Sequence, residues 1–202
     1  AGTVRSPSVL AVSPSVPAQT LPEFIAYAKA NPGKINFASG GIGTAPHLAG
    51  ELFKQMAGVN LVHVPYSSSY MPDLLAGRVQ VTFAPIATSI ANIKAGKLRA
   101  LAVTGATRSD VLPNIPTVSE LVPGYEASVW HGVGAPKGTA PDIIGKLNQQ
   151  INAVIADPSV KAHLAGLGAV PMPMTPGEFG KFVADEVKKW ANVVKLAGLK
   201  PE

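Results

Sequence analysis

The sequence predicts an α/β fold, because short apolar strand patterns alternate with amphipathic helix patterns along all 202 residues. The composition agrees with a folded protein, since 47% of the residues are hydrophobic and only 14% are charged. A disordered tail would carry more charge, and a coiled coil would be richer in Glu and Lys. No apolar run is long enough to cross a membrane.

The first half of the chain reads as strands separated by helices. Thr20-Leu-Pro-Glu23 has the pattern of a capping box that opens a helix, and Asn31-Pro-Gly33 stops that helix. The prolines between residues 13 and 17 keep the preceding segment extended. We expect strands at residues 9–12, 35–38, 61–64, 79–83 and 98–103, and helices at residues 21–30, 44–57, 71–76 and 86–95.

The pattern restarts at Tyr125, after a proline-rich loop over residues 110–122 that contains a helical turn. Thr175-Pro-Gly-Glu178 is a second capping box, and the long apolar stripe that follows it includes Trp190 as a predicted core residue. We expect strands at residues 126–133 and 169–172, and helices at residues 141–156, 158–168 and 175–197. The order of strands and helices predicts a mostly parallel sheet.

The strongest local feature is Ser39-Gly40-Gly41-Ile42-Gly43-Thr44, which lies between a predicted strand and a predicted helix. Glycines let backbone N–H groups point at one centre, and a helix N-terminus adds partial positive charge. Ser39 and Thr44 add hydroxyl groups, so the loop suits a carboxylate or a phosphate. The alternative is a plain tight turn with Thr44 as the N-cap. His47, in the first turn of the helix, either contacts the anion as a neutral donor or is structural.

Three further candidates follow the ends of strands, where ligands of parallel sheets usually bind. Tyr66 and Ser67 come after one strand, and Thr88 comes after the next. For Thr88 the alternative is helix capping. Trp130 lies on a strand and either walls a cleft or packs in the core. His63 also lies on a strand, and we interpret it as structural.

The net charge of +5 comes from 17 basic and 12 acidic residues scattered along the chain, so we expect no nucleic-acid partner. A mild positive excess suits a small anionic ligand. We expect no cofactor, because Gly41-Ile-Gly43 lacks the third glycine of a dinucleotide fingerprint. We expect no metal, because the chain has no cysteine and no two histidines have ligand spacing.

Several segments, taken in order, resemble one family. They are residues 20–33, Ile35–Thr44 with the following Ala45-Pro-His-Leu-Ala-Gly-Glu-Leu-Phe53, Val62-His-Val-Pro-Tyr66, residues 93–104, Leu112-Pro-Asn-Ile-Pro-Thr-Val-Ser-Glu120, Pro123-Gly-Tyr125 and Trp130. Together they resemble the Bug proteins, the TctC-like extracytoplasmic receptors of tripartite tricarboxylate transporters. The resemblance covers essentially the whole chain.

The resemblance implies a periplasmic receptor with a bilobal Venus-flytrap fold of the periplasmic-binding-protein type 2-like class. Such a receptor closes on a small mono- or dicarboxylate and delivers it to membrane permease subunits, without catalysis. It further implies that Trp130 lies close to the region between the lobes. One side of the site would be lined by Ser39, Gly40, Gly43, Thr44 and His47, with Tyr66 and Ser67 nearby.

Three departures from the family pattern shape these expectations. Ala1 corresponds to the middle of a family member, so one lobe should be near complete and the other partial. The loop Ser67-Ser-Ser-Tyr-Met-Pro72 is shorter than usual. Ala84-Pro85 replaces an Asp-Asn-like pair, which removes a partner for an ammonium group and favours simple carboxylates over amino acids.

We therefore expect a strand and hinge entry at residues 1–13, a ligand-binding lobe at residues 14–122, and the C-terminal half of the other lobe at residues 123–202. An apolar face on residues 123–202 should be exposed or covered by another chain, which leaves self-association through this partial lobe open. Two other functions stay open. One is a ligand-sensing effector domain of a regulator, and the other is a serine–histidine hydrolase, although the chain has no Gly-x-Ser-x-Gly elbow and no paired carboxylates.

Overall fold

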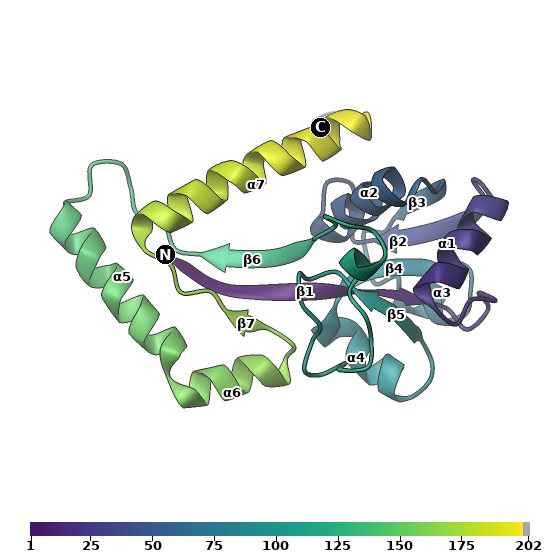
Figure 1. Cartoon of the computed structure of the whole chain (residues 1–202), viewed down its shortest axis with the longest axis horizontal. Helices are drawn as coiled ribbons and strands as arrows, with labels where there is room; N and C mark the ends of the chain where they lie inside the picture. The colour runs from purple at the N-terminus through teal and green to yellow at the C-terminus, as the bar shows by residue number, and fades with distance from the viewer. Residues whose placement is uncertain (200–202) are drawn as a thin grey trace.

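Strand β1 (Gly2–Val12) connects the two parts of the molecule in the computed structural model, which describes residues 1–199. Its C-terminal half pairs with β4 (Val81–Pro85) and β5 (Arg99–Val103), and its N-terminal half pairs with β6 (Ser128–Gly132) and β7 (Val170–Pro171). Figure 1 shows β1 passing from an extended arm, which holds α5, α6 and α7, into a body built around the other strands.

The sheet of the body has the order β3-β2-β4-β1-β5, with β2 at Ile35–Ser39 and β3 at Leu61–Pro65. The pairings of β2 with β3 and with β4 are parallel, but all four pairings of β1 are antiparallel. The expectation of a mostly parallel sheet was therefore wrong, because most of the strand pairings are antiparallel.

Two layers of helices enclose the sheet of the body. On one face α1 (Leu21–Ala30) and α2 (Ala45–Ala57) cover the main core, whose largest buried side chains include Phe24, Phe37, Phe53, Phe83 and Tyr125. A second buried cluster joins Val9 and Val103 to Ile86, at the start of α4 (Ile86–Lys94). The short α3 (Met71–Leu75) packs its Leu74 in a third cluster.

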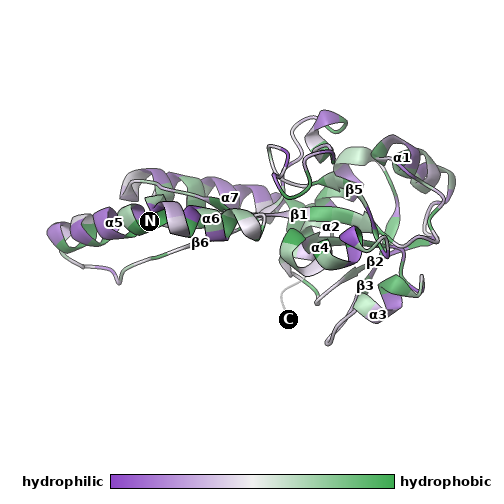
Figure 2. Cartoon of the chain, turned by 90° about the horizontal axis from the view of Figure 1, so that it is seen from below, coloured by the Kyte–Doolittle hydropathy of each residue, from purple (hydrophilic) through white to green (hydrophobic). Residues whose placement is uncertain are grey.

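The arm has little core of its own. It consists of α5 (Pro141–Ala156), α6 (Pro158–Gly166) and α7 (Pro176–Leu196), and only Ile155 and Val193 are buried in these three helices. Eight large apolar side chains of this region are exposed: Val133, Ile143, Leu147, Val154, Leu167, Val170, Val187 and Leu196. Exposed apolar side chains are thus present in the described part of residues 123–202, and Figure 2 shows hydrophobic segments alternating with hydrophilic ones along α5 and α6.

Helix α7 links the arm to the body. Figure 1 shows it running from beside the N-terminus back toward α2, and the Gln55 side-chain amide of α2 donates to the Val193 carbonyl at 3.3 Å. The capping box that opens α7 is present, since Thr175 and Glu178 exchange both hydrogen bonds. Among residues 1–199, no helix is long and apolar enough to span a bilayer.

Several predicted boundaries moved. Strand β1 is longer than the predicted residues 9–12, and β4 lies at residues 81–85 rather than 79–83. The box at Thr20 is incomplete: its side chain accepts from the Glu23 amide, but the Glu23 carboxylate accepts from the amide of Gln19 instead. A short 3-10 helix at Val118–Glu120 provides the predicted helical turn.

Candidate functional site

The glycine-rich loop leads from the end of β2 into the N-terminus of α2, as predicted. Gly41 and Gly43 have φ values of 128° and 75°, a region that L side chains rarely adopt. The first intrahelical bond runs from the Leu48 amide to the Thr44 carbonyl at 3.0 Å, so the amides of Ala45 and His47 have no partner inside the helix. With the helix dipole, these amides favour an anion.

The two hydroxyls of the loop are bonded within the loop itself. The Thr44 hydroxyl donates to the Gly41 carbonyl at 2.8 Å, and it makes no capping bond although Thr44 occupies the N-cap position. The Ser39 side chain is fully buried, donates to the same carbonyl at 2.9 Å and accepts from the Gly41 amide at 3.1 Å. These bonds fix the loop, and they occupy the Gly41 amide as well as both hydroxyls. The Gly43 amide donates to His47 and the Thr44 amide to the Gly41 carbonyl, so the amides left for a ligand at the start of α2 are those of Ala45 and His47.

A stacked pair of histidines lies beneath the loop. The ring of His47, only 2% exposed, stacks on the ring of His63 with centroids 3.6 Å apart and planes 12° apart. The Nδ1 atom of His47 accepts from the Gly43 amide at 2.9 Å, and its Nε2 lies 3.7 Å from a Glu51 carboxylate oxygen. The Nε2 atom of His63 lies 2.6 Å from the Ser39 hydroxyl.

Burial and charge set the protonation of this cluster. Burial, followed by the nearby charge of His47, lowers the pKa of His63 to about 4, so His63 is neutral near pH 7. Burial alone would raise the pKa of Glu51, but hydrogen bonds from His47 and Lys54 outweigh it and the pKa is lowered. The Lys54 ammonium lies 2.8 and 2.9 Å from the two Glu51 oxygens.

A hollow of about 240 Å³ brings the loop and Trp130 together. The indole nitrogens of Trp130 and Trp190 both donate to one Glu186 oxygen, at 3.0 and 2.9 Å. Trp190 is half-buried: it packs against the main core, as its helical stripe predicted, and also lines this hollow. No charged side chain lines the hollow, which is formed by Gly43, Ala45, Leu48, Ser128, Val129, Trp130 and Trp190.

Of the predicted site residues, Gly43 and Trp130 line this hollow, and the other eight do not: Ser39, Gly40, Gly41, Thr44, His47, Tyr66, Ser67 and Thr88. The Tyr66 hydroxyl donates to Asp73 at 2.9 Å, and burial, followed by this bond, raises the pKa of Tyr66. Ser67 is exposed. The Thr88 hydroxyl donates to the Pro85 carbonyl at 2.8 Å within the first turn of α4, and α4 has no side-chain cap, so Thr88 does not cap this helix. Gly40 is exposed at the edge of the loop, with open space around its Cα.

Sequence reasoning missed Glu186 and the contact between Ser39 and His63. The spacing of Glu186 and Trp190, one helical turn apart, is a signal that could have pointed to the first. The second depends on the parallel register of β2 and β3, which places Phe37 opposite His63 and Ser39 opposite Pro65. No group of three potential metal-ligating side chains is found among residues 1–199.

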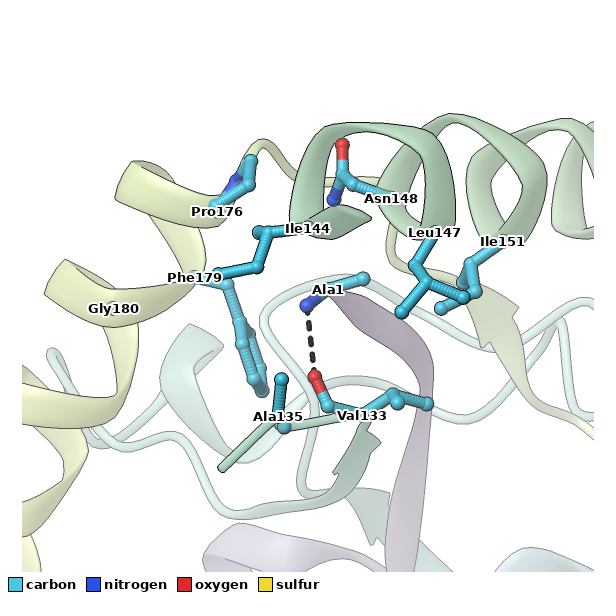
Figure 3. A pocket seen from close by; sticks show the side chains of 11 residues that line it. Ala1, Val133, Ala135, Ile144, Leu147, Asn148, Ile151, Pro176, Phe179 and Gly180 are labelled. Carbon is cyan, nitrogen blue, oxygen red and sulfur yellow. Dashed lines mark hydrogen bonds between the residues drawn. The ribbon is translucent and has the colours of Figure 1, made fainter. Parts of the chain in front are cut away.

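Two other hollows flank β1. The larger, of about 520 Å³, lies between the loop 105–110 and α6 and carries Arg5, Arg108 and Lys161. Arg5 and Arg108 are already paired with Glu126 and Glu120. An apolar groove of about 230 Å³ lies in the arm, where Figure 3 shows Ile144, Leu147 and Phe179 around the N-terminal residue and a bond from the Ala1 amine to the Val133 carbonyl, 3.0 Å long.

Comparison with known proteins gives the family. The family model described as "Tripartite tricarboxylate transporter family receptor" matches residues 1–199. The chain belongs to the TctC receptor family. It is 39% identical to Protein BugT of Bordetella pertussis over 197 residues, which are 96% of this chain and 60% of that protein. It is 36% identical to the UPF0065 protein in the gbd 5' region of Cupriavidus necator, over 94% of this chain and 58% of that protein.

Solved TctC-family structures agree with the architecture. The structure described as R. palustris Rpa4515 with adipate is 36% identical, with a TM-score of 0.86, and the match covers 100% of this chain and 68% of that one. The periplasmic binding protein BugD is 33% identical, with a TM-score of 0.81 and coverage of 100% and 69%. MatC from Rhodopseudomonas palustris, with bound malate, is 26% identical, with a TM-score of 0.77 and coverage of 96% and 68%. The type 2-like binding-protein fold, with one partial lobe, is thereby confirmed. The chain spans about 60% of the length of the curated relatives it matches.

Proposed function

We propose that this chain is a periplasmic solute-binding receptor that captures a small mono- or dicarboxylate for the permease subunits of a tripartite tricarboxylate transporter. The observation that carries the proposal is the N-terminus of α2, where the amides of Ala45 and His47 have no partner inside the helix and Ala45 lines a hollow with no charged lining. The adipate bound to Rpa4515 and the malate bound to MatC support a carboxylate as the ligand.

Backbone amides can hold a carboxylate here without a lysine or an arginine. Each hydrogen bond to a charged group contributes about 1.5–3 kcal/mol, and the helix dipole adds to it. We propose that Gly40, Gly41, Gly43 and Thr44 form the loop beside the ligand, that the amides of Ala45 and His47 donate to it, and that Trp130 walls the opposite side. Ser39 and His47 then support the loop from beneath, since both are buried. Tyr66, Ser67 and Thr88 are left as outer residues that a larger ligand would reach.

The two parts of the molecule support a division into lobes. We propose that residues 14–122 form the ligand-binding lobe, that residues 1–13 form the hinge entry, and that residues 123–202 contribute to the other lobe. In full-length relatives this second lobe would close on the ligand. In this chain the apolar groove beside Ala1 offers a surface for self-association.

A thermal-shift and calorimetry panel tests the carboxylate assignment. Adipate, malate and acetate are compared with adipamide, which is matched to adipate in length but has no charge, and with aspartate. We expect stabilisation by at least one carboxylate and none by adipamide. If no carboxylate stabilises the 202-residue chain, or if adipamide does so equally, the proposal fails.

A matched pair of variants tests the position of the site. Leu48 lines the hollow one turn into α2. Leu48→Glu adds a negative charge that repels an anion, whereas Leu48→Gln has the same size without the charge. We expect the glutamate variant to bind the carboxylate more weakly than the glutamine variant. Equal affinities would place the ligand elsewhere.

A further inference from the structure

His47 carries an acceptor bond that requires a defined tautomer. The Gly43 amide donates to its Nδ1 at 2.9 Å, so Nδ1 carries no proton. The proton of the neutral ring is then on Nε2, which points to the Glu51 carboxylate 3.7 Å away. An imidazole held in this tautomer is the only form that satisfies both neighbours.

The ring has little freedom to move. It is 2% exposed, stacks on His63, and lies 6.1 Å from the ring of Phe37. Glu51 is equally fixed, since it is 6% exposed and the Lys54 ammonium contacts both of its oxygens. The chain Lys54–Glu51–His47 therefore ends in a rigid acceptor aimed at Gly43.

We propose that His47 is a positioning residue, held in its Nε2–H tautomer by Glu51, that orients the Gly43 amide and so keeps the anion-binding loop in its binding conformation. The inference rests on the proposed function, since it assigns a role within that site. A side chain without an acceptor at this position would leave the Gly43 amide without its partner, and the loop would lose this restraint.

Two substitutions separate positioning from packing. His47→Asn places a carbonyl oxygen near the Nδ1 position, which can accept from the Gly43 amide. His47→Phe keeps an aromatic ring for the stack and removes the acceptor. The affinity for the carboxylate found in the panel is measured by calorimetry for the wild type and both variants at neutral pH. Thermal melts of each variant confirm that it is folded.

We expect His47→Asn to bind within about threefold of wild type, because it restores an acceptor for the Gly43 amide. His47→Phe should bind about tenfold more weakly, the effect of losing one hydrogen bond. If His47→Phe binds like wild type, or if His47→Asn binds as weakly as His47→Phe, the positioning role is refuted.

A measurement without ligand distinguishes failure of the positioning role of His47 from failure of the proposed function. Nuclear magnetic resonance on the free protein follows exchange of the Gly43 amide and the ring nitrogens of His47. Protection of that amide in wild type and His47→Asn, and its loss in His47→Phe, supports positioning even where no carboxylate binds. An unprotected Gly43 amide in the wild type, or a proton on Nδ1 at neutral pH, refutes it.

Discussion

Replacing Gly43 with alanine should weaken ligand binding more than its effect on stability explains. Gly43 has φ 75°, where an L residue costs about 1–2 kcal/mol, and a Cβ there meets no atom within 4 Å. The cost is therefore backbone strain alone. Relief of that strain turns the Gly43 amide away from His47, and the loop loses its binding conformation.

Gly96 supplies a matched control, because it has φ 68° and equally open surroundings but lies at the end of α4, away from the loop. Both alanine variants should lower the free energy of unfolding by about 1–2 kcal/mol, or the melting temperature by roughly 2–4 °C per kcal/mol. Only Gly43→Ala should also weaken carboxylate binding in calorimetry, by about tenfold, because the loop loses its hydrogen bond to His47 and with it its conformation. Equal affinities of the two variants would refute the role of the loop.

Three further predictions concern the surroundings of the site. Glu186→Ala removes the hydrogen-bond acceptor of both tryptophans of the chain, so the intrinsic fluorescence of the folded protein should shift. An unchanged spectrum would contradict the two hydrogen bonds to Glu186. The pKa of His63 is lowered to about 4, so the unfolded chain binds more protons than the folded protein between roughly pH 6.5 and pH 4. As the pH falls through this window, the free energy of unfolding should fall by about 1–2 kcal/mol after discounting for the partial exposure of His63. Urea titrations of His63→Phe should lack this fall. Gly50→Ala places a Cβ against the buried Phe37 ring, so thermal melts should show destabilisation by about 1–3 kcal/mol despite the better helix propensity of alanine.

The sequence predicted best the elements whose signals are local. The helix at residues 141–156 begins and ends where predicted, because Pro141 opens it and Pro158 prevents its continuation. The first half of β1 was missed, because Arg5-Ser-Pro-Ser8 has no apolar alternation. It is a strand only through pairing with β6 and β7, which lie more than 120 residues away in sequence. Pairing of this kind has no local signature.

The candidate site shows the same limit. The loop at residues 39–44 and its position before a helix could be predicted, since glycine content and a helix start are local features. The hydrogen bonds of the loop could not be predicted, because the Thr44 and Ser39 hydroxyls could bond to a ligand, to the helix end or to the Gly41 carbonyl. In the structure both donate to the Gly41 carbonyl. The histidine stack joins α2 to β3, so it depends on how these two elements pack. His47 and His63 are 16 residues apart in the sequence, and no local pattern connects them.

The uninterrupted pairing of β1 determines how the two parts can move. Its last pair with β6 is Pro7 with Ser128, and its first pair with β4 is Ser8 with Pro85, so no unpaired residue separates the two sheets. Rotation of the arm against the body must then be absorbed as torsion of a hydrogen-bonded ribbon, which stores elastic energy and returns it on release. A hinge of this type stays protected in hydrogen exchange while it bends, unlike a loop hinge, whose amides exchange freely.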